Sequence, residues 1–273
     1  MTVTFDWSAV APAWDAHRRH THTTTSPVTE ALVAALGLVP GEAVLELATG
    51  TGELALRLAG LVGATGSVLA TDAAAGMVAL TQAILEGLPQ ARTAQVDAAA
   101  TGLGDGVFDA VVCCHGLMFV PEPSKALSEC HRVLRAGGRL AAAVWAAPQH
   151  NPWVSNIGMA AMVHGLAAGG PPTGPGGLFS LADPDALRTL VEGAGFRDVH
   201  LDEVAVSFTF ASSDEYFEIV SSLAGPLAAL IAAGPPEQRA AVQATATELV
   251  ASHRRPDGKV ELPGLALVVS GRA

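Results

Sequence analysis

One stretch of the chain, residues 43–58, constrains the fold more than any other. It reads AVLELATGTGELALRL. Its first five residues form a short apolar run, which is typical of a strand buried on both faces of a parallel sheet. Gly50 and Gly52 follow, and a run of good helix formers begins at Glu53. We predict a strand, a tight glycine turn and a helix whose free N–H groups face a ligand.

Three classes of ligand are bound at such a turn, and the residues distinguish them. A phosphate-binding loop ends in G-K-[ST], and neither of the two lysines of the chain is near. A dinucleotide fingerprint would place Ala48, Gly50 and Glu53 at its glycine positions, so only the middle one fits. The run 46–52, ELATGTG, fits the pattern acidic-x-G-x-G-x-G of S-adenosylmethionine (SAM) methyltransferases, with Ala48 as the single departure.

Acidic residues lie on both sides of the glycine turn, at positions that suit SAM. Glu46 suits SAM because SAM carries an α-ammonium and a sulfonium but no phosphate. The next expected strand, 67–72, ends at Asp72, about 20 residues on, where an acidic side chain binds ribose hydroxyls. Asp72 could instead cap the helix expected over 73–87. A tight connection without a ligand also remains open, because a fold-level pattern does not prove a site.

Three further strands are expected in the same half of the chain. The strand 92–97 ends at Asp97, which could meet an adenine amino group while the N–H of Ala98 meets a ring nitrogen. The strand 108–114 is followed by His115, and a fifth strand covers 139–145. Because ligands gather at the carboxyl ends of parallel strands, these side chains are expected to lie together.

The alternation of strands and helices over 43–145 implies right-handed crossovers and a parallel sheet. We predict an α/β fold that is Rossmann-like and doubly wound, with a mostly parallel seven-stranded sheet and helical lid insertions. The expected organisation is an N-terminal cap at 1–27, a SAM-binding core at 28–147, a lid insertion at 148–182, and a C-terminal part of the core at 183–273 with a helical insertion at about 211–256.

The N-terminal cap is rich in histidine and threonine. We expect a turn or two of helix around 8–19, then a polar loop, then a helix over 27–38 that Ser26 caps. His17, His20 and His22 have the spacing H-x-x-H-x-H, but no cysteine or carboxylate set completes a tetrahedral metal site. We therefore predict no metal, and a cap that is either mobile or closes over the cofactor.

The C-terminal part is expected to combine core strands with a helical cover. The sequence predicts a helix over 183–194, a strand over 196–210, helices over 213–233 and 236–253, and a last antiparallel strand over 262–270. The helical insertion and the apolar segment 153–166 could cover an acceptor pocket, form a homodimer contact, or simply pack in the core. For an acceptor pocket, the expected apolar lining residues are Met118, Phe119, Trp145, Trp153, Met159, Met162, Phe179, Tyr216 and Phe217.

Taken together, these motifs resemble class I SAM-dependent methyltransferases. The segments VLELATGTGELALRLA, VLATDAAAGMV, the isolated Asp97 and FDAVVCCHGLMFVPEPSKALSECHRVLRAGGRLAAAVW carry the resemblance, which is greatest to the ubiquinone/menaquinone-biosynthesis branch and to actinomycete small-molecule methyltransferases. The resemblance implies that SAM is the cofactor and S-adenosylhomocysteine the product. The implied cofactor-binding residues are Glu46, Ala48, Thr49, Gly50, Gly52, Asp72, Ala73, Met77, Asp97, Ala98, Cys114 and His115.

The expected reaction is methyl transfer to oxygen or carbon of a mostly apolar small molecule, quinone-like or a secondary metabolite. His115 is the candidate catalytic base, because imidazole titrates in the useful range; it could instead only line the pocket. No N/D-P-P-Y type motif is present, which argues against amide or adenine N-methylation. A SAM-binding cyclase or isomerase, or a non-catalytic SAM-binding protein, remains the alternative.

The composition excludes several partners. The formal net charge is −11 and no stripe of Lys or Arg exists, so nucleic acid and anionic membrane surfaces are not expected partners. No apolar run is long and pure enough to span a bilayer, and the N-terminal residues lack the order of a signal peptide. The three cysteines are odd in number and form no C-x-x-C, so we expect a cytoplasmic location.

Overall fold

The computed structural model describes residues 5–167 and 172–273. Residues 1–4 of the expected cap and 168–171 of the expected lid lie outside the described residues. The strands are β1 (Ala43–Leu47), β2 (Ser67–Asp72), β3 (Ala91–Gln95), β4 (Phe108–Cys114), β5 (Leu134–Trp145), β6 (Arg197–Phe210) and β7 (Val260–Arg272).

These strands form one seven-stranded sheet with the order β3-β2-β1-β4-β5-β7-β6. Strands β1 to β5 pair in parallel, and β7 is antiparallel to both β5 and β6. The predicted fold class is therefore confirmed. Because β1 lies between β2 and β4, the order reverses at β1, and the carboxyl ends of these three strands meet at the switch point where α/β sheets bind ligands.

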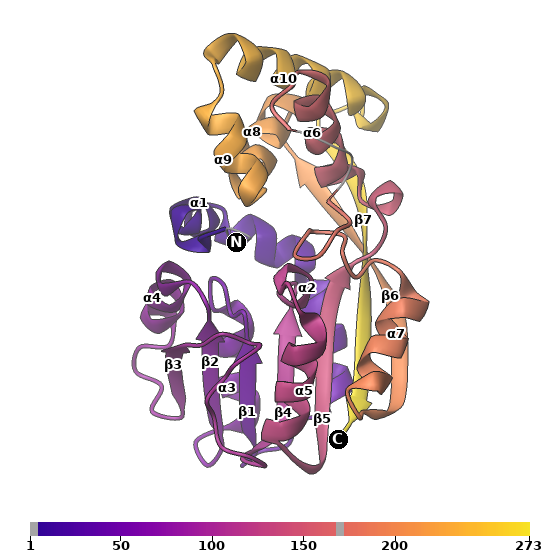
Figure 1. Cartoon of the computed structure of the whole chain (residues 1–273). Helices are drawn as coiled ribbons and strands as arrows, with labels where there is room; N and C mark the ends of the chain where they lie inside the picture. Colours follow the sequence, from indigo (N-terminus) through magenta and orange to yellow (C-terminus); the bar gives the residue numbers. More distant parts are fainter. Residues whose placement is uncertain (1–4, 168–171) are drawn as a thin grey trace.

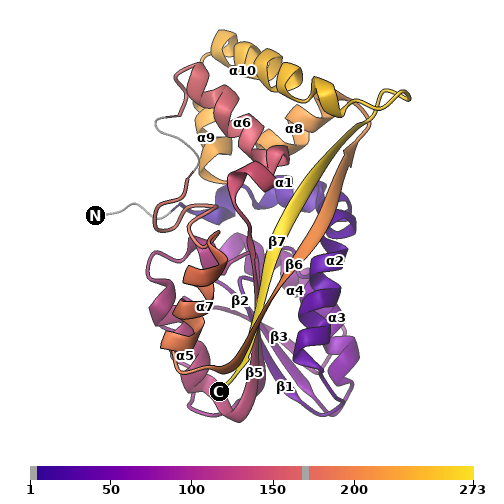
Figure 2. The same cartoon turned by 90° about the vertical axis from the view of Figure 1, so that its right-hand side faces the viewer.

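Helices cover both faces of the sheet and build a separate layer above its carboxyl end. Helices α2 and α3 lie on one face, and α5 and α7 lie on the other (Figure 2). Helices α6, α8, α9 and α10 form the upper layer, and α1 lies between this layer and the sheet (Figure 1). The helices are α1 (Ala11–Ala16), α2 (Arg18–Leu36), α3 (Glu53–Val62), α4 (Ala75–Ile84), α5 (Pro123–Val133), α6 (Pro152–Val163), α7 (Pro184–Gly193), α8 (Ser213–Leu223), α9 (Pro226–Ala233) and α10 (Pro236–Leu249), with short 3-10 turns at Trp7–Ala9, Leu117–Phe119, Pro148–His150 and Ala251–His253.

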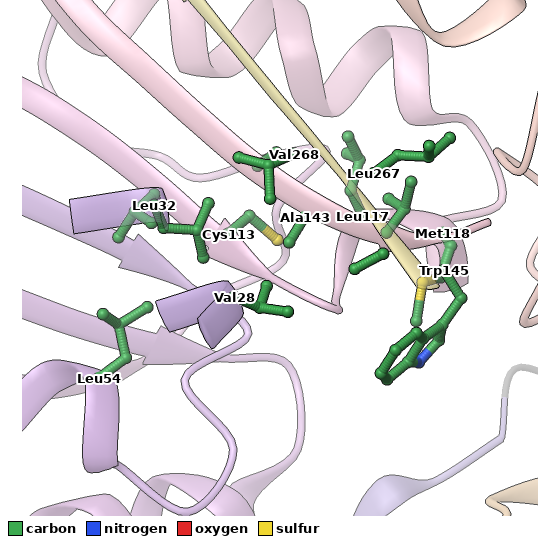
Figure 3. Packing of buried hydrophobic residues seen from close by; sticks show 14 of the residues in the cluster. Val28, Leu32, Leu54, Cys113, Leu117, Met118, Ala143, Trp145, Leu267 and Val268 are labelled. Carbon is green, nitrogen blue, oxygen red and sulfur yellow. The ribbon is translucent and has the colours of Figure 1, made fainter. Parts of the chain in front are cut away.

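The core is packed between α2 and the central strands. Val28 and Leu32 of α2 are fully buried, and Figure 3 shows them in one cluster with Cys113 of β4 and Val268 of β7. Full burial of one aliphatic side chain of this kind contributes about 1.5–3 kcal/mol. At one end of the cluster Trp145 lies beside Met118 (Figure 3), so the core continues into the region of the strand ends.

The N-terminal region is more helical than the sequence predicted. The expected polar loop and the expected helix start at Pro27 are wrong, because α2 runs from Arg18 through Pro27 to Leu36. Proline has no N–H to donate to the carbonyl four residues earlier. Here the Ser26 Oγ donates to the Thr23 carbonyl oxygen at 3.0 Å. The helix thus keeps that acceptor occupied, and its buried C-terminal half anchors a polar first half.

The cover helices differ from prediction at one point. The single helix expected over 213–233 is two helices, α8 and α9, whose axes differ by 113°. The break falls at Gly225, which has a φ of 55°, and at Pro226, which begins α9. No single helix in the described part of the chain is long and apolar enough to cross a membrane. The bend turns α9 back toward the carboxyl end of the sheet.

A buried asparagine joins this cover to the sheet. Asn151 is fully buried just before α6. Its Nδ2 donates to the carbonyl oxygens of Ala146 and Leu265 at 2.9 and 3.1 Å, and its Oδ1 accepts from the N–H of Leu265 at 3.0 Å and from Trp153 Nε1 at 3.1 Å. A buried amide with all these partners fixes the position of α6 relative to β5 and β7.

Candidate functional site

A cavity of about 1200 Å³ opens at the carboxyl ends of β1, β2 and β4, beneath the cover helices. It is larger than the roughly 300–1,000 Å³ of most small-molecule sites, so it has room for two ligands. Eleven of the twelve residues expected to bind the cofactor line it: Glu46, Ala48, Thr49, Gly50, Asp72, Ala73, Met77, Asp97, Ala98, Cys114 and His115. The twelfth, Gly52, is not among the lining residues; it is the N-cap of α3 and lies against Thr81.

The most unusual group in the cavity is the carboxyl of Glu46. Glu46 lies in β1 with 1% of its surface exposed. Thr49 Oγ1 donates to its Oε2 at 3.0 Å, and Thr71 Oγ1 donates to its backbone carbonyl oxygen at 2.7 Å. Burial raises its pKa to about 8, and the nearby Asp72 acts in the same direction. No salt bridge to Glu46 is found within the described residues. The carboxyl is thus a buried acceptor that lacks a cation.

Asp72 fixes the glycine turn to the next strand. Its Oδ2 accepts from the N–H of Gly50 at 3.1 Å, and its Oδ1 accepts from the N–H of Ala74 at 2.9 Å. Burial raises its pKa, while these backbone donors act against that rise. Each carboxylate oxygen has a second lone pair, so the group can still accept two hydrogen bonds from a vicinal diol. The alternative role of Asp72 as the N-cap of the next helix is wrong, because Ala74 is the N-cap of α4 and no side chain caps that helix. Asp72 instead fixes the turn before α4, and its binding of ribose stays a prediction.

The glycine turn after β1 has Ala48 where the pattern has glycine. It tolerates this alanine because Gly116, which follows β4, leaves room for the side chain. Gly50 and Gly52 have φ values of 59° and 91°, and Ala48 has a φ of 53°, which is strained for a residue with a Cβ. A Cβ added at Gly116 would lie 2.2 Å from the Ala48 Cβ and 3.0 Å from the Cys113 Sγ. Ala48 is thus accommodated because position 116 carries no side chain.

The loop after β3 places Asp97 and Ala98 in the cavity lining. Asp97 Oδ1 accepts from the N–H of Ala99 at 2.8 Å, so one oxygen holds the local turn. Farther along, Glu129 of α5 accepts from the N–H and hydroxyl of Thr101 at 2.9 and 2.6 Å, and Arg132 donates to the Leu103 carbonyl oxygen at 2.8 Å. The Arg132 guanidinium lowers the pKa of Glu129 to about 2. This fastening of the loop to α5 was not predicted.

His115 follows β4 with a φ of 54°, a conformation in which histidine is among the commoner non-glycine residues. Its ring stacks on Trp145, with centroids 4.1 Å apart and planes 10° apart. Both ring nitrogens are buried and have no hydrogen-bond partner among the described residues. Burial lowers its pKa to about 3, so the imidazole is neutral at physiological pH. His115 thus lines the cavity with two ring nitrogens that are available to hydrogen-bond to a ligand.

The N-terminal residues, expected to be a cap that is either mobile or closes over the cofactor, form one wall of the same cavity. Trp7 packs on Phe119 with ring centroids 4.6 Å apart, and a Cβ at Gly225 would lie 2.8 Å from its ring. Trp7 therefore bridges the core and the cover helices. Ser8 Oγ accepts from the N–H of Gly76 at 3.1 Å, which ties the segment to α4. Trp14 and His20 also line the cavity.

Apolar side chains from the cover complete the cavity. The expected lining residues Met118, Phe119, Trp145, Trp153, Met159, Met162 and Phe179 are found there. Tyr216 and Phe217 are not; both are fully buried in the core. On α8 the residues that line the cavity are Ile219, Val220 and Leu223. The error is one of helical phase, because a three-residue step along α8 selects a different part of its surface.

The part of the chain that the structure describes contains no cluster of metal ligands. No group of three His, Cys, Asp or Glu side chains there is arranged to hold a metal ion. His17 lies at the junction of α1 and α2, whereas His20 and His22 lie within α2. His20 lines the cavity and stacks on Phe210 with ring centroids 5.1 Å apart.

The residues present fit SAM. The buried Glu46 carboxyl, which has no salt bridge within the described residues, matches an α-ammonium, and the Asp72 oxygens match a ribose diol. Gly50 in its left-handed conformation lets the backbone approach a ligand closely. No lysine or arginine of the described residues lines the cavity, which fits a cofactor without phosphate.

Comparisons with known proteins agree with this assignment. Residues 45–142 match the family described as a methyltransferase domain. The chain is 34% identical over 121 residues to the ubiquinone/menaquinone biosynthesis C-methyltransferase UbiE of Pseudoalteromonas translucida, covering 43% of this chain and 48% of the relative. It is 30% identical over 175 residues to UbiE of Escherichia coli O1:K1, covering 60% and 69%. The crystal structure of the cyclase SpnF has a TM-score of 0.55 at 22% identity, covering 90% of this chain and 79% of that chain.

The chain therefore belongs to the class I SAM-dependent methyltransferase family, and SAM is its cofactor. The likeness to SpnF shows the shared fold. The chain matches about half the length of the first curated relatives. The acceptor of this chain must therefore be inferred from the residues of its own cavity.

The contact between Ala48 and position 116 yields a stability prediction. Gly116→Ala should destabilise the fold by about 1–3 kcal/mol, because its Cβ would overlap that of Ala48. Ala48→Gly removes the obstacle, so the double variant should recover part of the loss. Chemical denaturation of the four proteins measures the coupling. Strictly additive effects would show that the two positions do not compete for space.

The pKa of Glu46 yields a prediction on cofactor binding. A carboxyl with a pKa of about 8 is protonated below that pH, and a neutral carboxyl attracts an ammonium poorly. SAM affinity should therefore fall as the pH falls from 8 to 6, by roughly tenfold or more. Calorimetric titration measures this, and Glu46→Gln is the control that should bind weakly at both pH values. A wild-type affinity that is constant over this range would contradict the prediction.

Proposed function

We propose that the protein transfers the methyl group of SAM to an oxygen or carbon atom of a mostly apolar small molecule. One observation supports this most: a single cavity joins the acidic strand ends to a lining of aromatic and methionine side chains, with His115 where the two regions meet. Small-molecule sites are mainly apolar with a few polar groups, and this second region has that character. The first region has the acids and glycines that SAM requires.

The chemistry of the step is an in-line displacement at the sulfonium methyl, for which SAM supplies the activated group. The chain supplies position and exclusion of water. Glu46, Asp72 and Asp97 hold the cofactor from three different strand ends. The cover helices and Trp7 close the site from above, and they bring apolar side chains against the acceptor.

His115 is proposed to orient the acceptor. A neutral imidazole accepts a hydrogen bond from an acceptor hydroxyl, and this directs the oxygen or the adjacent ring carbon toward the methyl group. A base with a pKa of about 3 holds a proton poorly in the free protein, so orientation is the larger part of the proposed role. The stack on Trp145 fixes the ring, which favours a defined geometry.

The curated relatives named for ubiquinone and menaquinone biosynthesis support a quinone-like acceptor methylated on carbon. An oxygen acceptor is equally compatible with His115. Cys113, Cys114 and Cys130 are free thiols, in keeping with the predicted cytoplasmic location, which stays a prediction. A homodimer also stays a prediction.

The direct test incubates the protein with methyl-labelled SAM and a panel of apolar phenols and quinols, with tRNA and protein as alternative acceptors. The proposal expects a labelled apolar product and S-adenosylhomocysteine in equal amounts. Conversion of an acceptor without S-adenosylhomocysteine would indicate a cyclase or isomerase instead. Tight SAM binding without turnover of any acceptor would indicate a binding protein, and label in tRNA or protein would overturn the acceptor class.

The role of His115 is tested by His115→Asn, which tolerates the left-handed backbone but loses the imidazole. The turnover number should fall about 10²-fold, while the SAM dissociation constant stays near that of the wild type. At saturating SAM, the wild-type turnover number should show no decline with an apparent pKa between 6 and 7, because His115 gains a proton only near pH 3. Such a decline, lost in the variant, would instead assign a titrating base to His115.

A further inference from the structure

A row of aromatic rings runs along the acceptor region from His115 to His20. His115 stacks on Trp145, whose ring lies 6.1 Å from that of Phe208. Phe208 and Phe210 are 6.5 Å apart with planes within 9° of parallel, and Phe210 contacts the His20 ring at 5.1 Å. All five side chains line the cavity. Trp145, Phe208 and Phe210 thus separate two imidazoles.

Both imidazoles have a buried nitrogen that lacks a hydrogen-bond partner among the described residues. His20 Nε2 is buried without a hydrogen-bond partner among the described residues, as both nitrogens of His115 are. Leaving a buried polar atom unpaired is unfavourable, so a group that persists in this state is expected to find its partner in a ligand. His115 adjoins the cofactor residues, whereas His20 projects from α2 at the far end of the row.

The surroundings of His20 show which partner fits. Thr21, Thr25 and Thr29 of α2 also line the cavity, so this helix presents polar atoms to it beside the aromatic rings. No lysine or arginine of the described residues lines it, so a carboxylate or phosphate would lack a counter-charge. Burial lowers the pKa of His20, although Glu215 acts in the opposite direction and His17 in the same one. A neutral oxygen group is the matching partner.

We propose that His20 is a second anchor for the acceptor, hydrogen-bonded through Nε2 to a neutral oxygen at the end of a flat conjugated molecule whose reacting end lies beside His115. The molecule lies along Trp145 and Phe208, because flat rings stack favourably on aromatic side chains, and the fully buried Phe210 supports the His20 ring. Three side chains separate the anchors, so the acceptor spans more than one ring. This inference rests on the proposed function and makes His20 a specificity-determining residue.

The test compares two probes that differ by one distal oxygen, 4′,7-dihydroxyflavone and 7-hydroxyflavone. Their dissociation constants are measured by calorimetry with the protein saturated with S-adenosylhomocysteine. The wild type should prefer the dihydroxy probe by about tenfold, the usual value of one hydrogen bond to a buried group. His20→Phe keeps a ring against Phe210 but has no nitrogen, and it should lose the preference.

Two control variants test whether the effect is specific to the hydrogen-bonding nitrogen of His20. His17→Phe makes the same change at a histidine outside the cavity lining, and it should keep the preference. His20→Gln retains a hydrogen-bonding group and should keep part of it. If His20→Phe fails to bind S-adenosylhomocysteine, and so is not folded, His20→Ala takes its place in the same comparison.

Three outcomes overturn the proposal: neither flavone binds, the wild type does not distinguish them, or the preference survives removal of His20. All three leave the proposed function intact, because methyl transfer to other apolar acceptors is measured separately. Failure of the protein to bind SAM or S-adenosylhomocysteine would instead reject the proposed function.

Discussion

The site depends on one buried carboxyl group at the switch point of the sheet. Glu46 ends up in β1 between β2 and β4, so Asp72 and His115 flank it from the neighbouring strand ends. Burial of an acid is unfavourable without a cation, and the hydroxyl of Thr49 only partly compensates. Burial therefore leaves the group neutral in the free protein, with a pKa of about 8. A ligand ammonium supplies the missing charge, which explains why an acid is retained in a strand that packs on both faces.

Much of the core was predictable because its signals are local. Buried apolar runs predicted β1, β2 and β4 with the observed bounds, and the cap at Asp183 predicted α7, since its side chain accepts from two N–H groups of the first turn. The first half of α2 was missed because its polar residues have weak helix propensity, and tertiary packing of its second half decides the outcome. The break between α8 and α9 has a local signal in the sequence, the Gly225–Pro226 pair, because glycine followed by proline interrupts a helix.

The cofactor half and the acceptor half of the site also differ in how much of each the sequence predicts. The cofactor half follows from spacing along one βαβ unit, so Glu46, Asp72 and Asp97 could be found from the sequence. The acceptor half is assembled from β5, β6, α2, α6 and α8, and no local pattern shows that His20 and His115 share one row of rings. The compensation between Ala48 and Gly116 is also invisible locally, because the two residues meet only across neighbouring strand ends. The acceptor half of the site therefore depends on tertiary contacts, which no single segment of the sequence shows.

The most direct test of this account counts the protons exchanged when SAM binds. Calorimetric titrations at pH 6.5, in two buffers of different ionisation enthalpy, give that number. If Glu46 is neutral in the free protein and charged beside the ammonium, the wild type releases close to one proton per SAM bound, and Glu46→Gln releases none. Binding without proton release in the wild type, or equal release from the variant, would show that Glu46 is not the group that receives the cofactor's charge.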